Sequence, residues 1–211
     1  MKISYAITVK DELNELELLV NFLIKRKRTE DEIVILYDSK NGSKGVDEWL
    51  RSNSVAENNY RWHNRDFNDD FADHKNHLMG LCTGDYIFQI DADELPSETL
   101  IGILPELLES NPNNEVYLVP RVNTVEGLTE EHIQRWRWNL NSKGWVNWPD
   151  YQWRIYKNIP TIKWINRVHE KLDGFTTYAA IPLEGQFEGC YLIHPKTIER
   201  QERQNSYYGT L

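Results

Sequence analysis

Apolar and polar positions form alternating blocks along the first half of the chain. Three apolar runs, Ile3 to Val9, Ile33 to Tyr37 and Tyr86 to Ile90, are rich in β-branched and aromatic residues and are typical of buried strands. Between the first two, leucines recur at helical spacing from Asp11 to about Arg28. A fourth strand is predicted at Glu115 to Val122. This alternation predicts an α/β fold with a mostly parallel central sheet and helices on both faces.

Local signals indicate where the helices begin and end. Asp11 is placed to cap the first helix, and Thr83-Gly84 ends a later one. Ser97 is predicted to cap a helix that continues to about residue 109, in which Pro105 should cause a kink or an early end. The polar and aromatic stretch from Asn58 to Asp73 has no clear period, and we assign no strand there.

The sequence changes character after about residue 126. Six of the eight tryptophans lie between Trp136 and Trp164. We expect this segment to form strands and loops over the working edge of the sheet, so residues 1–211 would be a single domain with halves at about 1–125 and 126–211. Aromatic residues mostly fill cores, although their faces also stack on sugar rings. We therefore expect one or two of these tryptophans to line a binding groove.

Charge and cysteine content narrow the class of protein. The chain has 24 Lys and Arg against 33 Asp and Glu, a net charge of −9, which argues against a basic nucleic-acid-binding face. Two cysteines, Cys82 and Cys190, are too few for a disulfide framework or a Cys-rich zinc site. The apolar runs are far shorter than the roughly twenty residues of a transmembrane helix, and no signal peptide is evident. We expect a cytoplasmic protein, with peripheral contact at the inner membrane face left open.

The strongest chemical signal is the acidic segment Asp91-Ala92-Asp93-Glu94 after a buried strand. In α/β sheets, ligands bind outside the carboxyl ends of the strands, where Asp38 also lies. Two carboxylates one residue apart are hard ligands that suit Mg²⁺ or Mn²⁺ with a diphosphate as co-ligand. The alternative is an acidic turn that caps the next helix.

Four segments of the first half form a combined pattern, namely Ile7 to Glu12, Leu36 to Ser43, Asp73 to Asn76 and Gly84 to Glu94. In their order and spacing they resemble family 2 glycosyltransferases, which have the GT-A fold. The later segments Trp153 to Asn158 and Arg167 to Glu170 resemble one bacterial branch of that family, which includes lipopolysaccharide-core heptose and glucose transferases. The resemblance covers about residues 3–200.

The resemblance implies a metal-dependent transfer of a sugar from a nucleoside diphosphate sugar, a UDP-sugar in our prediction, to an acceptor hydroxyl with inversion. It makes residues 1–125 the nucleotide-sugar half and 126–211 the acceptor half. Lys75 stands where the family often has arginine, so the charge is kept and the bidentate geometry is lost. The residues implied in donor binding are Thr8, Glu12, Asp38, Lys75 and Asp91.

Asp93 matches the metal ligand of the family, and His194 is the candidate for a downstream histidine that completes the Mn²⁺ or Mg²⁺ site. An inverting transfer also needs a general base. Asp150 and Glu170 are the two candidates, and we prefer Glu170 because its segment is more like the acceptor side of the family. The alternative for each is an ordinary surface or salt-bridged acid.

The acceptor stays open between a glycan, a lipid-linked molecule, a protein and a modified nucleic acid, and a viral origin stays open too. A surface of arginines between the tryptophans would hold an anionic acceptor or stack nucleobases. The arginines concerned are Arg135, Arg137, Arg154 and Arg167.

Three other functions are weighed against a transferase. A sugar nucleotidyltransferase would have a Gly-rich phosphate loop near the first strand, and Ala6 to Asp11 contains no glycine. A non-catalytic carbohydrate-binding module would not need Asp91 and Asp93 at a strand end. In hydrolases that form an aspartyl phosphate, the Asp-x-Asp pattern continues with Thr or Val, whereas here Glu94-Leu95 follow.

Overall fold

The computed structural model describes residues 1–53 and 60–208. Its helices are α1 (Leu13–Arg26), α2 (Lys44–Asn53), α3 (Phe71–Leu81), α4 (Glu98–Ser110), α5 (Glu130–Trp136) and α6 (Ile198–Tyr208). Its strands are β1 (Ile3–Val9), β2 (Glu32–Asp38), β3 (Tyr60–Arg65), β4 (Tyr86–Asp91), β5 (Leu95–Pro96), β6 (Val116–Glu126), β7 (Val146–Lys157), β8 (Lys163–Ile165), β9 (Lys171–Asp173), β10 (Tyr178–Ala180) and β11 (Leu192–Thr197).

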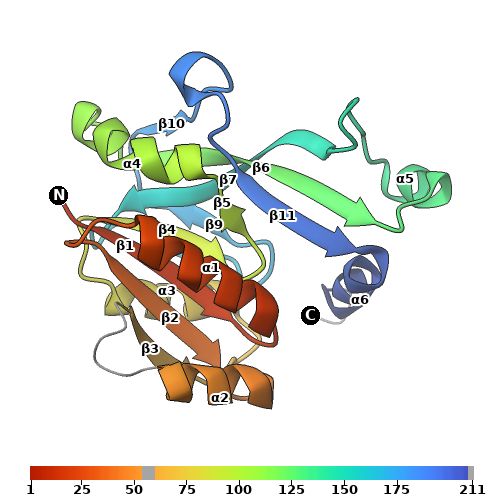
Figure 1. The fold of residues 1–211 in the computed structure, drawn as a ribbon, viewed down its shortest axis with the longest axis horizontal. Helices are drawn as coiled ribbons and strands as arrows, with labels where there is room; N and C mark the ends of the chain where they lie inside the picture. The colour runs from red at the N-terminus through yellow and green to blue at the C-terminus, as the bar shows by residue number, and fades with distance from the viewer. Residues whose placement is uncertain (54–59, 209–211) are drawn as a thin grey trace.

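One sheet organises most of the described residues, in the order β3-β2-β1-β4-β7-β6-β11-β5, with β10 beside β6 (Figure 1). The pairs among β1, β2, β3 and β4 are parallel, as is the pair of β6 with β11. By contrast, β7 runs antiparallel to both β4 and β6, and β5 runs antiparallel to β11. The prediction of a mostly parallel sheet is therefore confirmed.

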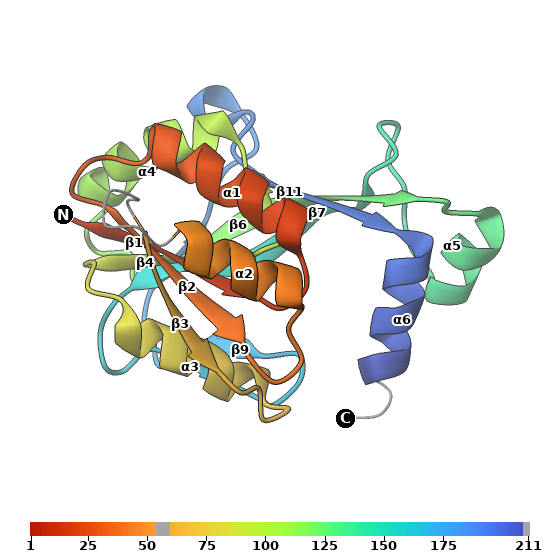
Figure 2. The same cartoon turned by 60° about the horizontal axis from the view of Figure 1, so that its bottom comes forward.

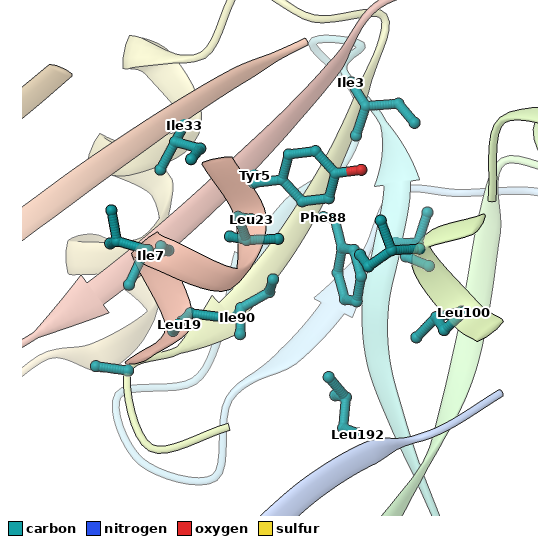
Figure 3. Close-up of a cluster of buried hydrophobic side chains, with 14 of the residues drawn as sticks. Ile3, Tyr5, Ile7, Leu19, Leu23, Ile33, Phe88, Ile90, Leu100 and Leu192 are labelled. Atoms are coloured by element: carbon teal, nitrogen blue, oxygen red, sulfur yellow. The ribbon is translucent and has the colours of Figure 1, made fainter. Parts of the chain in front are cut away.

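Side chains of the central strands alternate between two cores, one on each face of the sheet. On β1, Tyr5 and Ile7 belong to the core that α1, α2 and α4 cover, whereas Ala6 belongs to the core that α3 covers. Figure 3 shows the first of these cores, in which the ring of Tyr5 lies beside that of Phe88 on β4. Helices therefore cover both faces, as the pattern of apolar residues predicted.

The helix ends differ in part from the sequence predictions. The cap prediction for Asp11 is wrong: Glu12 occupies the N-cap of α1, and its carboxylate accepts the backbone N–H groups of Lys10 and Asp11. Pro105 does not shorten α4, which continues to residue 110. The Ser97 cap is confirmed, because its hydroxyl accepts the N–H of Leu100.

The stretch from Asn58 to Asp73 contains a strand that the sequence analysis missed. Residues 58 and 59 lie outside the described part, and β3 follows at the edge of the sheet, parallel to β2. None of the residues of β3 is fully buried, so they lack the apolar pattern of the central strands.

One part of the structure extends beyond the body of the sheet (Figures 1 and 2). We call this part the wing, and it consists of the carboxyl-terminal end of β6, α5, the start of β7, the end of β11 and α6. Trp145 and Trp148 pack against Tyr191, which comes directly before β11.

No helix in the described residues combines the length and apolarity needed to cross a membrane. Cys82 and Cys190 are buried free thiols.

Candidate active site

A cleft of about 1430 Å³ opens at the carboxyl ends of β1, β2 and β4 and reaches across to the wing. Parallel strands present their carboxyl ends at one edge, which brings together side chains far apart in sequence. All nine residues singled out from the sequence line this cleft, namely Thr8, Glu12, Asp38, Lys75, Asp91, Asp93, Asp150, Glu170 and His194.

Asp38 lies at the end of β2, where it organises the loop that follows. Its Oδ1 accepts the backbone N–H groups of Lys40, Asn41 and Phe67 at 3.0, 3.2 and 3.1 Å. Its Oδ2 accepts the Asn41 side-chain amide at 3.0 Å. The carboxylate is therefore held in one orientation beside the cleft.

Asp91 ends β4 and sits opposite Thr8 of β1 in the parallel register. Thr8 Oγ1 donates to Asp91 Oδ1 at 3.1 Å, Arg154 Nη2 lies 2.7 Å from Oδ2, and Lys75 Nζ lies 3.7 Å from Oδ1. Burial raises the pKa of Asp91, but the charges of Arg154 and Lys75 outweigh it and hold the pKa well below its usual range. Asp91 is therefore an anion in the folded chain.

Glu94 is a central residue of the site that the sequence analysis did not assign a role. Its fully buried carboxylate lies 2.8 Å from Arg121 Nη1 and 2.5 Å from Arg154 Nη2. Arg121 in turn pairs with Asp150 at 2.7 Å. Glu94 thus connects Asp91 with Asp150 through two arginines of β6 and β7. Its position directly after the Asp-x-Asp motif was the available signal.

Asp93 and His194 meet across the cleft. His194 Nε2 lies 3.2 Å from Asp93 Oδ2, and His194 Nδ1 lies 2.7 Å from Asn123 Oδ1. Arg200 Nη2 lies 3.2 Å from the same Asp93 oxygen. Burial raises the pKa of Asp93, but the hydrogen bond with His194 and the charge of Arg200 hold it at about 2.

The two candidate bases have different partners. Asp150 Oδ2 accepts from Arg121 and Asn123, and its Oδ1 accepts from Gln152. Burial raises the pKa of Asp150, but the charge of Arg121 and these hydrogen bonds outweigh it, so the pKa lies below its usual value. Glu170 Oε1 lies 2.5 Å from Lys75 Nζ, which itself lies 4.7 Å from the centre of the Trp164 ring.

The wing and the late strands contribute the aromatic part of the cleft. Trp138, Trp153 and Trp164 line it, which is more than the one or two tryptophans expected. Arg154 does not belong to a surface of arginines, because its side chain is buried against Asp91 and Glu94. The tertiary pairing, which the sequence does not encode locally, takes it out of solvent.

The sequence of residues 4–173, well over half of the chain, matches the model of the family described as Glycosyl transferase family 2. The chain belongs to glycosyl transferase family 2. Its mixed sheet with helices on both faces is the GT-A fold of that family. Comparison of this family 2 chain with curated protein sequences found no match.

Solved structures share the fold at low sequence identity. S. aureus TarS 1–349 superposes with a TM-score of 0.60 and 12% identity over 92% of this chain and 60% of that one. For the same protein in complex with UDP-GlcNAc the TM-score is 0.54 and the identity 13%, over 90% of this chain and 62% of that one. For the structure described as S. aureus TarS the TM-score is 0.51 and the identity 15%, over 75% of this chain and 28% of that one. This family 2 chain therefore spans about 60% of the TarS 1–349 chain.

Proposed function

We propose that this chain transfers a sugar from a nucleoside diphosphate sugar to an acceptor hydroxyl with inversion. The observation that carries the proposal is the convergence of Asp38, Asp91 and Asp93 on one cleft at the carboxyl edge of a family 2 glycosyltransferase sheet. In this proposal the nucleotide occupies the half of about residues 1–125 and the acceptor the half of about 126–211.

Asp93 and His194 fit a divalent cation as far as their chemistry goes, since they present an anionic oxygen and an imidazole nitrogen to the same space. No group of three or more His, Cys, Asp or Glu side chains that would hold a metal is found within residues 1–53 and 60–208. A cation here would therefore need further oxygen ligands from the diphosphate of the sugar donor, as Mg²⁺ and Mn²⁺ commonly take from phosphates. When bound, it would neutralise charge on the departing diphosphate.

Glu170 is our proposed base. A general base works best when its pKa lies near the working pH, and the contacts of Asp150 with Arg121, Asn123 and Gln152 move it away from that range. Glu170 faces the same cleft and is held by Lys75, which also lies near Asp91. Lys75 would thus orient the base relative to the donor.

UDP is the first nucleotide to test, because TarS, which shares the fold, is known in complex with UDP-GlcNAc. The aromatic lining of Trp138 and Trp153 suits the apolar faces of a sugar acceptor. The narrower assignment to the lipopolysaccharide-core branch stays a prediction from the sequence.

The test is thermal unfolding with UDP, GDP, CMP and dTDP, each with and without Mn²⁺. A ligand at about 100 times its Kd stabilises the folded state by roughly 2.7 kcal/mol. We expect a Mn²⁺-dependent rise in Tm with one nucleotide, lost in Asp93→Ala and kept in Asp173→Ala, which removes an exposed carboxylate of β9. A folded wild-type protein that responds to no nucleotide contradicts the proposal and favours a carbohydrate-binding module.

A further inference from the structure

Arg200 makes a set of contacts that a surface arginine would not need. Its Nη2 lies 3.0 Å from Glu12 Oε1 and 3.2 Å from Asp93 Oδ2, and its Nη1 lies 3.5 Å from Glu15 Oε1. Its side chain is about a quarter exposed and lines the cleft. The guanidinium therefore lies among three carboxylates of the nucleotide half, although it belongs to the wing.

The helix that carries Arg200 is held across the cleft. α6 begins directly after β11, the strand of His194, and stands opposite the carboxyl end of β2 (Figure 2). At its other end the hydroxyl of Tyr207 lies 3.3 Å from Asp69 Oδ1. Arg200 and Tyr207 thus place one face of α6 along the nucleotide half, and both residues line the cleft.

Arg200 and a divalent cation would compete for the same oxygen. The guanidinium already lies against Asp93 Oδ2, the carboxylate oxygen that also contacts His194. A Mg²⁺ ion on that oxygen would sit about 2.1 Å from it, close to a second positive group. The two cations repel each other unless an anion with oxygens for both lies between them. A diphosphate is such an anion, and guanidinium groups bind phosphate oxygens with two parallel hydrogen bonds.

We propose that Arg200 is a donor-site residue with two successive partners. In the free chain it neutralises Asp93, and when cation and donor bind it transfers to the diphosphate oxygens. This inference rests on the proposed function, because it assumes a nucleoside diphosphate in the cleft. It predicts effects of opposite sign on the metal alone and on the metal with the nucleotide.

The test is Arg200→Met, which keeps much of the aliphatic stem and removes the charge. Mn²⁺ binding is measured by electron paramagnetic resonance of the free ion, and binding of UDP or GDP, whichever stabilises the wild type, by calorimetry in saturating Mn²⁺. We expect Mn²⁺ alone to bind several-fold more tightly, because its competitor is gone. We expect the nucleoside diphosphate to bind at least about tenfold more weakly, because the loss of even one of the two charge-assisted hydrogen bonds has about that effect. The matching nucleoside should bind weakly and equally to both proteins.

Arg135→Met is the matched control, because Arg135 pairs with Glu131 and Glu202 on the wing and does not line the cleft. Both affinities should match the wild type there. Arg200→Lys, which keeps the charge, should restore part of the diphosphate affinity. If both affinities fall together in Arg200→Met, or neither changes, Arg200 only tethers α6 and the inference is wrong. A wild-type protein that binds no nucleoside diphosphate overturns the proposed function as well.

Discussion

Asp91 and Asp150 keep their negative charges at the cleft because each is paired with an arginine of the β6–β7 strand pair. Arg154 pairs with Asp91 and Arg121 with Asp150. Both pKa values are lowered against the opposing effect of burial. A carboxylate in such a pairing is a good electrostatic partner and a poor proton acceptor. Asp150 is held by Arg121, Asn123 and Gln152 together. Glu170, by contrast, pairs with Lys75 and lies in the segment more like the acceptor side of the family, so Glu170 takes the role of base in our proposal.

Glu170→Gln should stop sugar transfer and spare nucleotide binding. The amide keeps the shape of the side chain and cannot accept the proton, and general-base catalysis is typically worth 10²–10⁴-fold. The measurement is the rate of UDP release from the donor sugar, with the Kd of UDP as the binding check. Asp150→Asn is the comparison. If Asp150→Asn loses the rate and Glu170→Gln keeps it, the base is Asp150.

At the scale of elements, β7 is inserted antiparallel between β4 and β6. This places two arginines of the β6–β7 pair directly over the turn after β4, where Glu94 receives both. The sequence motif marked Asp91 and Asp93, but it could not show that Glu94 would be buried. Burial of a carboxylate is tolerated because it is paired with two guanidinium groups.

Glu94→Gln should lower the free energy of unfolding by about 3 kcal/mol, because it leaves the buried Arg154 and the partly buried Arg121 short of one counter-charge. Urea unfolding of the wild type and the variant measures this difference. Glu98→Gln is the matched control, since that exposed carboxylate pairs with Arg26 at the surface and should change stability by less than about 1 kcal/mol. Equal losses in the two variants would show that Glu94 is not a structural centre of the site.

The edges of the sheet were harder to predict than its centre. The buried strands β1, β2 and β4 carry long apolar runs because both their faces are covered. β3 is an edge strand with no fully buried side chain, and its sequence pattern is correspondingly weak. The cap of α1 was also misassigned, because the Glu12 side chain turns back to the N–H groups of Lys10 and Asp11.

The stability of the whole molecule depends on carboxylates whose pKa is lower in the folded chain than in the unfolded chain. Burial raises the pKa of Glu32, but its contacts with Ser4, Thr83 and Lys2 outweigh this effect and lower the pKa to about 2. The pKa of Asp93 is also about 2. A group whose pKa is lower in the folded state contributes stability above its unfolded pKa and loses it as the pH falls toward the folded pKa.

Stability should therefore fall steeply between about pH 4.5 and pH 2. One unit of pKa lowering is worth about 1.4 kcal/mol, so the mostly buried Glu32 contributes on the order of 3 kcal/mol. Urea midpoints at pH 7, 5, 4 and 3 measure the effect. Glu32→Gln should lower the midpoint at pH 7 and flatten its dependence on pH. A midpoint that stays constant from pH 5 to pH 3 in the wild type contradicts the prediction.

The sequence by itself determined the buried strands β1, β2, β4 and β6 with helices between them, and which acidic residues would stand at strand ends, because both follow from local periodicity. It also placed the chain in family 2 of the glycosyltransferases, which the family match confirms.

Only the tertiary structure decided which arginine pairs with which acidic side chain. Arg121, Arg154 and Arg200 are brought to Glu94, Asp91 and Asp93 by the antiparallel insertion of β7 and by the return of α6 across the cleft. Those pairings join residues far apart in sequence. They depend on strand order and register, which local periodicity does not encode.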